Sequence, residues 1–291
     1  MANRPSLSLV IPVYRGATFL AVTLQKTWDW LATQDRATEL LVVDDGSDDA
    51  TPAILAEFAT RCTPSSDRTF TLLHNARNRG KGFSVRRAFL LARSDLVVFT
   101  DADLTYPLEN VPVIVKALED GADVAYGSRM HANSRYIVAP SFFGKLFTRH
   151  TMGRAFNLAV RVLAVPGVFD TQAGLKGCRK AAAERLAGRV QLSRFSFDVE
   201  LFAVARRLGM HLADCPVLFV YRKEPSTVHF VRDSLAMLRD MLRVRWRCLR
   251  GVYDREPSAS RLHDLRQGGV ATGIGPASVV STQPAKARRS G

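Results

Sequence analysis

The stretch Leu96-Val-Val-Phe-Thr-Asp-Ala-Asp103 joins a short apolar run to two carboxylates. Consecutive apolar residues predict a strand that is buried on both faces, because a strand with one wet face alternates apolar and polar residues. The same pattern recurs at Leu40–Val43, which is followed by Asp44 and Asp45. Buried strands that end in acidic residues indicate a parallel sheet with a polar site along its carboxyl edge.

Strand and helix patterns alternate on both sides of this stretch. The expected strands are Leu7–Val13, Leu40–Val43, Phe70–Leu73, Leu96–Thr100, Asp123–Tyr126 and Val217–Tyr221. The expected helices are Ala17–Leu31, Thr51–Phe58, Gly82–Ala92, Val111–Glu119 and Ser196–Leu208. The alternation predicts an α/β fold with a mostly parallel sheet and helices on both faces.

The pattern over Val228–Leu249 predicts a basic amphipathic helix. Apolar residues recur along one side: Val231, Leu235, Leu238, Leu242 and Leu249. Arginines are interspersed: Arg232, Arg239, Arg243, Arg245, Arg247 and Arg250. Such a helix either lies in a membrane interface or packs its apolar side on the protein's own core.

The residues after Asp254 are rich in Ser, Gly, Pro and Ala and contain no aromatic side chain. This composition predicts a disordered tail. The predicted organisation is therefore a catalytic domain over residues 1–222, the amphipathic helix region over 223–254 and a disordered tail over 255–291.

The charge and the cysteines limit the partners and the compartment. The 291 residues carry 41 Lys and Arg against 27 Asp and Glu, a net charge of +14, which favours an anionic partner such as nucleic acid, acidic lipid or a phosphorylated substrate. No apolar run approaches the ~20 residues that cross a bilayer, and no signal peptide is apparent, so we expect any membrane contact to be peripheral. The four cysteines lack metal-site spacing, and a reducing cytoplasm is the simplest compartment for them.

Asp101 and Asp103 lie two residues apart, so one carboxylate can face a metal while the other meets a nucleotide. Mg²⁺ or Mn²⁺ takes such hard oxygen ligands and can bridge them to phosphate. A metal held there would offset the charge that develops on a departing nucleoside diphosphate. The same motif also fits two solvated acids at a strand end, but its position after a buried run favours the metal site.

The acidic cluster after Leu40–Val43 has two interpretations. Asp44 or Asp45 could accept hydrogen bonds from a nucleobase or from ribose hydroxyls. The cluster could also form a turn in which Asp49 caps the helix that begins near Thr51.

Basic residues follow two other expected strands. Asn78-Arg-Gly-Lys-Gly82 lacks the spacing of a Walker A loop, but a helix that begins there would attract an anion. Arg129, Arg149 and Arg154 could form a phosphate pocket, because the arginine fork suits phosphate oxygens. Taken one by one, these arginines also fit an ordinary solvated surface.

Together these motifs resemble the family 2 glycosyltransferases of the GT-A fold, from about Ser8 to Gly251. The resemblance is carried by Val10-Ile-Pro-Val-Tyr14, Val42-Val-Asp-Asp-Gly-Ser47, Asn78-Arg-Gly-Lys-Gly82, Thr100-Asp-Ala-Asp103 and Gly127-Ser-Arg129. Within the family the chain is similar to the polyprenyl-phosphate branch. Asp170-Thr-Gln-Ala-Gly-Leu-Lys176 and Arg194-Phe-Ser-Phe-Asp-Val-Glu-Leu201 are most similar to dolichyl-phosphate β-glucosyltransferases.

The resemblance implies inverting transfer of a hexose, with glucose favoured, from a nucleotide sugar to a polyprenyl or dolichyl phosphate at the cytoplasmic face of an anionic membrane. The implied donor-binding residues are Pro12, Tyr14, Asp44, Asp45, Lys81 and Asp101. The implied metal ligands for Mg²⁺ or Mn²⁺ are Asp103 and Asp101, and the implied acceptor-phosphate residues are Arg129, Arg149 and Arg154. Asp170 would orient the sugar or the acceptor, or would act as a base if the acceptor were a hydroxyl. The implied catalytic set is Asp101, Asp103, Asp170 and Arg129.

The chain departs from the family pattern in two places. Tyr14-Arg-Gly-Ala17 stands where the family usually has Tyr-Asn-Glu-Glu, and Thr105 stands where mannose synthases have a glutamine that can join the metal. The alternatives are a GDP-mannose-using polyprenyl-phosphate enzyme, an enzyme that acts on a glycan or soluble hydroxyl, and a basic module that binds membrane or nucleic acid. The aspartates at the expected site would repel nucleic-acid phosphates, so we expect no nucleic-acid partner.

Overall fold

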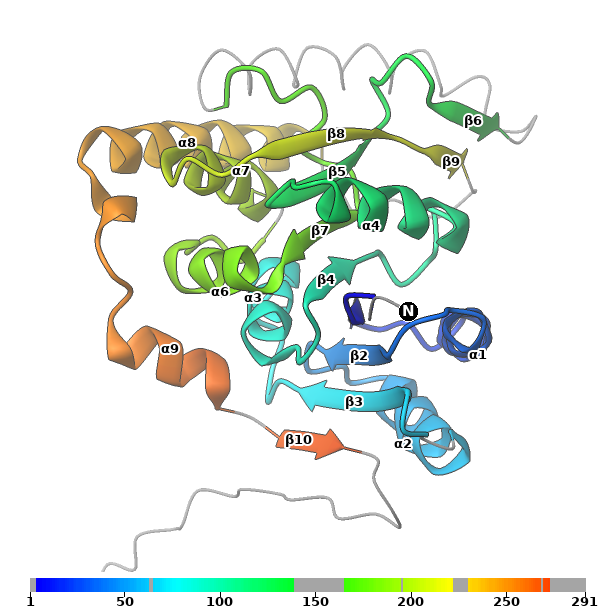
Figure 1. Ribbon diagram of the computed structural model, residues 1–291. Helices are drawn as coiled ribbons and strands as arrows, with labels where there is room; N and C mark the ends of the chain where they lie inside the picture. The colour runs from blue at the N-terminus through cyan, green and yellow to red at the C-terminus, as the bar shows by residue number, and fades with distance from the viewer. Residues whose placement is uncertain are drawn as a thin grey trace, which may run out of the picture.

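A computed structural model describes residues 4–62, 65–138, 165–194, 196–221, 230–267 and 269–272. Within these residues an eight-stranded sheet has the order β10-β3-β2-β1-β4-β7-β5-β8 (Figure 1). Its strands are β1 (Leu7–Val13), β2 (Thr38–Asp44), β3 (Arg68–His74), β4 (Leu96–Phe99), β5 (Val124–Ser128), β7 (Lys176–Arg179), β8 (Leu212–Pro216) and β10 (Gly269–Thr272). Only β7 and β10 run antiparallel to their neighbours, so the predicted mostly parallel sheet is confirmed.

Helices cover both faces of the sheet. The helices on one face are α1 (Leu20–Ala32), α2 (Thr51–Arg61) and α4 (Val111–Glu119), and those on the other are α3 (Lys81–Leu91), α6 (Lys180–Arg189) and α7 (Phe197–Arg207). Successive residues of β1 serve different faces: Leu9 and Ile11 pack in one core, whereas Val10 packs in the other. Because both faces are covered, the strands need continuous apolar runs, as the sequence indicated.

The strand order reverses between β1 and β4. From β1 the chain moves outward through β2 and β3 and then returns to β4 on the other side of β1. Loops that leave adjacent strands in opposite directions open a ligand site at the carboxyl ends of those strands. Antiparallel β7 begins at this same edge, because Lys176, its first residue, pairs with Phe99, the last residue of β4. The segment before β7, which includes Asp170 and Gly174, therefore leads to the same edge.

A smaller parallel pair of strands, β6 (Arg135–Val138) and β9 (Leu218–Tyr221), lies beside the main sheet. A one-turn 3-10 helix, η1 (Leu108–Asn110), is hydrogen-bonded to β9. The Asn110 amide donates to the Leu218 carbonyl and accepts from the Leu218 N–H. The sequence predicted β9 but not β6.

The C-terminal segment is ordered where the sequence predicted disorder. After α8 (Phe230–Leu249) and a short 3-10 helix, η3 (Val252–Asp254), the chain forms α9 (Ala259–Arg266), and β10 then extends the sheet. The side chain of Leu265 is fully buried, and Asp264 makes a two-pronged ion pair with Arg79 at 2.7 Å. The prediction of a disordered tail over 255–291 is therefore wrong for residues 255–267 and 269–272. The composition of this segment predicts a flexible chain, but its contacts with the rest of the protein outweigh that tendency. Residues 273–291 lie outside the described ones.

Removing residues 255–291 should lower the melting temperature, whereas removing only 273–291 should leave it unchanged. Loss of the Leu265 burial and of the Arg79–Asp264 pair should cost about 3 kcal/mol of unfolding free energy, which corresponds to roughly 10 °C for a domain of this size. Thermal denaturation followed by circular dichroism gives both values. Equal melting temperatures for the two truncated chains would show that α9 adds nothing to stability.

Candidate active site

Asp101 and Asp103 lie in a tight turn directly after β4. The N–H of Leu104 donates to the Asp101 carbonyl at 3.1 Å, and the N–H of Thr105 donates to Oδ1 of Asp103 at 2.9 Å. Leu104 has φ +49°, a left-handed conformation that costs a residue with a Cβ about 1–2 kcal/mol. The surrounding fold therefore enforces this turn, and the turn fixes both predicted metal ligands.

Asp101 is enclosed from two directions. A Cβ atom added at Gly174 would lie 1.9 Å from Oδ2 of Asp101, so the segment before β7 can pass this carboxylate only as glycine. On the other side, Nζ of Lys81 donates to Oδ1 of Asp101. The structure thus brings together Asp101, Asp103 and Lys81, three of the residues that the sequence assigned to the donor and its metal.

Lys81 is the first residue of α3, and its backbone is held by close packing. Gly80 has φ +91°, and the N–H of Gly82 donates to the carbonyl of Ser193 at 2.8 Å. Burial alone would lower the pKa of Lys81, but the carboxylates of Asp101 and Asp198 outweigh it and raise the pKa above its ordinary value. Lys81 is therefore a fixed positive charge at the N-terminus of a helix, where an anionic group binds favourably.

The two aspartates at the end of β2, Asp44 within the strand and Asp45 just beyond it, are buried and hold loops in place. Asp44 accepts from the N–H of Ser47 at 3.0 Å and faces Nδ1 of His74 at 2.8 Å. Asp45 accepts from the Asn75 amide at 2.8 Å and from the backbone N–H groups of Arg79 and Gly80 at 2.9 and 2.7 Å. The Asp45 carboxylate is thus committed to the loop that carries Lys81, and it shapes the expected donor site from behind.

The acidic loop after Asp45 also contains the predicted turn. Asp49 accepts from the N–H of Thr51 at 3.0 Å, at the start of α2. Asp49 therefore makes the contact that the turn interpretation predicts, although the N-cap of α2 is Ala50, one residue later.

The end of β1 presents an accessible aromatic ring. Pro12 is partly buried within the strand, and Tyr14, just beyond it, is exposed. Arg15 lies 5.2 Å from the centre of the Tyr14 ring and pairs with Asp48 at 2.6 and 2.7 Å. At this departure from the family pattern, an arginine therefore crosslinks the loops after β1 and β2.

Arg129 and Asp170 form a three-point contact at the same edge. The backbone N–H and Nε of Arg129 donate to Oδ2 of Asp170 at 2.9 and 2.7 Å, and Nη2 donates to Oδ1 at 2.8 Å. Asp170 is fully buried, whereas 29% of the Arg129 side chain is exposed. Burial would raise the pKa of Asp170, but the Arg129 guanidinium holds it below its ordinary value. Asp170 is therefore a charged group that orients Arg129; the other predicted acceptor residues, Arg149 and Arg154, lie outside the described residues.

A buried ion pair, Lys176–Asp198, lies close to these groups. The sequence had not identified either residue as a site residue. Nζ of Lys176 donates to Oδ1 of Asp198 and to the Ala173 carbonyl, both at 2.5 Å. Burial raises the pKa of the Asp198 carboxyl and lowers that of the Lys176 ammonium. The only signal for this pair was the resemblance of the two segments that contain these residues to known enzymes, because nothing in their spacing predicts that they meet.

The carboxylates present fit a divalent metal that the donor helps to bind. Asp101 and Asp103 offer hard oxygen ligands, and the part of the chain that the structure describes has no group of three or more His, Cys, Asp or Glu suited to holding a metal. Mg²⁺ is commonly bound by one or two carboxylates together with substrate phosphates and water. The site therefore suits a metal that arrives with a diphosphate better than a resident structural ion.

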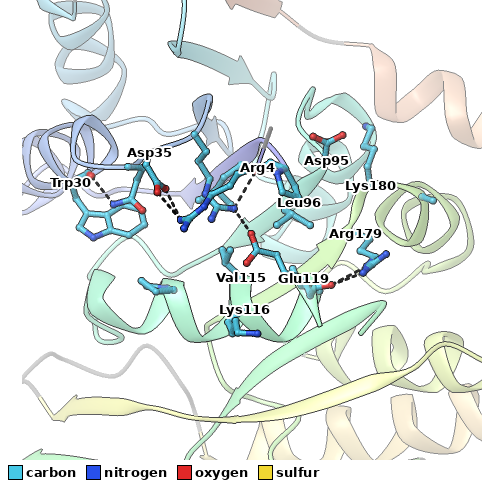
Figure 2. A pocket seen from close by; sticks show the side chains of 17 residues that line it. Arg4, Trp30, Asp35, Asp95, Leu96, Val115, Lys116, Glu119, Arg179 and Lys180 are labelled. Atoms are coloured by element: carbon cyan, nitrogen blue, oxygen red, sulfur yellow. Dashed lines mark hydrogen bonds and ion pairs between the residues drawn. The ribbon is translucent and has the colours of Figure 1, made fainter. Parts of the chain in front are cut away.

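A groove lies at the opposite edge of the sheet (Figure 2). This open groove of about 1170 Å³ is lined by Leu7 and Leu96, the first residues of β1 and β4. Two ion pairs lie within its lining, Arg4–Asp35 at 2.7 Å and Arg36–Glu119 at 2.8 Å. None of the predicted site residues lines it.

Comparison with known proteins places the chain in a family. Residues 8–165 match the model of the glycosyl transferase family 2 domain. The chain is a family 2 glycosyltransferase. It is 30% identical over 258 residues to the dolichyl-phosphate beta-glucosyltransferase of Mus musculus, an alignment that covers 85% of this chain and 77% of the relative. The corresponding enzyme of Drosophila melanogaster is 31% identical over 268 residues, with 87% and 79% covered.

A solved structure supports the fold. The structure of a mannosyltransferase from Pyrobaculum calidifontis, in complex with GDP-Man and Mn²⁺, superimposes on this chain with a TM-score of 0.53. The two sequences are 20% identical, and the superposition covers 91% of this chain and 79% of the mannosyltransferase chain. The predicted GT-A fold and the predicted family are therefore confirmed.

Asp170→Asn should destabilise the protein by about 3 kcal/mol at neutral pH, because it leaves the partly buried Arg129 without its counter-charge. The pKa of Asp170 is lower in the folded state than its unfolded value of about 3.9, so this stabilisation is complete above that pH and is lost as the pH falls further. Urea unfolding of both proteins between pH 7 and pH 3 should show the difference shrinking only at the acid end. The exposed Asp35→Asn is the matched control, and an Asp170→Asn effect independent of pH would contradict the assignment.

Proposed function

We propose that the chain transfers glucose, with inversion, from UDP-glucose to a dolichyl or related polyprenyl phosphate, using Mg²⁺ or Mn²⁺. The observation that carries the proposal is the similarity to dolichyl-phosphate beta-glucosyltransferases over more than four-fifths of the chain. The geometry supports it, because the Asp101–Asp103 turn, Lys81 and the Arg129–Asp170 pair all lie along one edge of the sheet.

The acceptor chemistry suits the commitment of Asp170 to Arg129. A phosphate monoester is already largely ionised near neutral pH, so its oxygen can attack the anomeric carbon without losing a proton to the protein. Asp170 is committed to Arg129 by three hydrogen bonds, which suits a positioning role better than proton abstraction. An acceptor hydroxyl would need a base, so this contact favours a phosphate acceptor over a glycan.

The residues of the chain then act mainly by positioning and by charge. Arg129, oriented by Asp170, would bind the acceptor phosphate, and Lys81 at the N-terminus of α3 would face the donor diphosphate. The new bond forms from the acceptor oxygen to the anomeric carbon while the bond from that carbon to the diphosphate breaks on the opposite face. A divalent metal held by Asp101 and Asp103 would supply charge compensation for the departing diphosphate.

Asp103→Ala should lower glucosyl transfer at least about 100-fold, because it removes a ligand that compensates charge on the leaving group. The assay combines the full chain, UDP-glucose, Mn²⁺ or Mg²⁺ and a short polyprenyl phosphate, and follows the radiolabelled lipid. EDTA should stop the reaction, and the exposed Asp35→Ala should retain wild-type activity. Transfer that survives both EDTA and Asp103→Ala would refute the metal role, whereas transfer only to soluble sugars would refute the lipid acceptor.

The helix α8 offers a surface through which such an enzyme could meet its lipid. Leu238, Leu242, Trp246 and Leu249, here called the α8 apolar stripe, are 40–78% exposed. The stripe therefore does not pack on the protein's own core; Met241 and Val244, on the other side of the helix, do so instead. The side chains of Val231 and Leu235 lie outside the described ones.

We propose that the α8 apolar stripe rests on an anionic bilayer at the cytoplasmic face of the membrane. Arg239, Arg243, Arg245 and Arg250 flank the stripe on the exposed part of the helix, and basic residues beside an apolar face attract acidic lipids. In the described part of the chain no helix is long and apolar enough to span a membrane, so the proposed contact is an interfacial one.

Replacing Leu242 and Trp246 by serine should weaken binding to phosphatidylserine-containing vesicles at least about 10-fold, since two large apolar side chains each contribute ~1.5–3 kcal/mol when buried. Vesicle flotation at low and high salt measures the binding, and salt should weaken it further by screening the arginines. Val22→Ser removes an equally exposed apolar residue from α1 and serves as the matched control. Unchanged vesicle binding by the double variant would contradict the proposed contact.

A further inference from the structure

Lys81 and Asp101 form an ion pair where the metal of the donor is expected. Nζ of Lys81 donates to Oδ1 of Asp101, and the two side chains are 33% and 34% exposed. The pair is therefore accessible to a ligand. Because Asp101 is one of the two carboxylates that suit the metal, a divalent ion and the Lys81 ammonium must compete for the same group.

We propose that Lys81 is an internal counter-cation that keeps the metal weakly bound until a nucleoside diphosphate arrives. The inference rests on the proposed function only in assuming a nucleoside-diphosphate donor. When the diphosphate binds, the ammonium turns from the carboxylate to phosphate oxygens, and the metal takes its place at Asp101. Metal and nucleotide then raise the affinity of the protein for each other, as thermodynamic linkage requires.

The metal has few ligands when it arrives alone. Oδ1 of Asp103 already accepts from the N–H of Thr105, and Oδ1 of Asp101 accepts from Lys81. The described residues hold no cluster of three potential ligands that could bind the ion without help. A dication that entered alone would also place its charge beside the Lys81 ammonium, and like charges in a partly buried site repel strongly.

The Lys81 side chain can turn without a movement of the loop. Its backbone is fixed by the contact of Gly82 with Ser193, whereas four methylene groups carry the ammonium. Nζ also lies 5.4 Å from the ring centre of Phe99, and the negative charge of the Asp198 carboxylate attracts the ammonium. These neighbours stabilise the Lys81 ammonium in this region, and the ammonium can bond either to the Asp101 carboxylate or to a phosphate oxygen.

Titration of the full chain with Mn²⁺, followed by electron paramagnetic resonance, tests the proposal. For the wild type, UDP should tighten Mn²⁺ binding at least about 10-fold, after subtraction of a protein-free titration of Mn²⁺ with UDP. Without nucleotide, Lys81→Met should bind Mn²⁺ about 10-fold more tightly than the wild type, and UDP should add less to its affinity. Lys81→Arg keeps the charge and should behave like the wild type without nucleotide.

Two results would overturn the proposal. One is a wild-type Mn²⁺ affinity that UDP does not change, a result that needs no variant to fold. The other is a Lys81→Met protein with a wild-type melting temperature that binds Mn²⁺ no more tightly than the wild type. The titration uses neither sugar nor lipid, so a failure of glucosyl transfer to polyprenyl phosphate would refute the proposed function and leave the Mn²⁺ result intact.

Discussion

The active edge of this protein depends on the compensation of buried carboxylates. Asp44, Asp45, Asp170 and Asp198 are all buried, and an ionised carboxylate removed from water without partners costs far more than a domain can tolerate. Each accepts hydrogen bonds from nearby donors: the N–H of Ser47 for Asp44, backbone N–H groups for Asp45, Arg129 for Asp170 and Lys176 for Asp198. These contacts tie the loop after β2 to the loop after β3, the loop after β5 to the segment before β7, and β7 to α7, and so bring distant parts of the chain together.

Helix α7 shows how the same requirement links the site to its surroundings. Asp198, in its first turn, pairs with the buried Lys176. Glu200, two residues later and fully buried, accepts from the N–H groups of Gln191 and Leu192 and from Arg247 and Tyr253. One short helix therefore connects the charge network of the site, the loop that contacts Gly82, and α8.

The sequence predicted the elements whose pattern is local. Buried strands such as Leu96–Phe99 and amphipathic helices such as Val111–Glu119 have their own periodicity, and both lie where they were expected. The position of Asp101 and Asp103 at a strand end was also predictable, because a parallel sheet collects its strand ends at one edge. Strand β7, Lys176–Arg179, was not predicted, since its polar and small residues acquire strand geometry only from β4 and β5 on either side. The ordered segment after Asp254 was missed for the same reason: Leu265 and Asp264 are informative only once their partners on other elements are known.

The contacts between residues of the site also could not be predicted from a local sequence pattern. Arg129 and Asp170 were each candidates, but their separation of 41 positions gave no sign that one holds the other. This contact changes the chemistry that can be assigned, because a carboxylate held by three hydrogen bonds to an arginine is suited to positioning, not to accepting a proton from substrate. A phosphate acceptor needs a fixed cation and no base, and the Arg129 guanidinium is a cation whose orientation is fixed by the buried Asp170 carboxylate. The pair thus compensates the burial of Asp170, and it is the contact from which the proposed phosphate acceptor is argued.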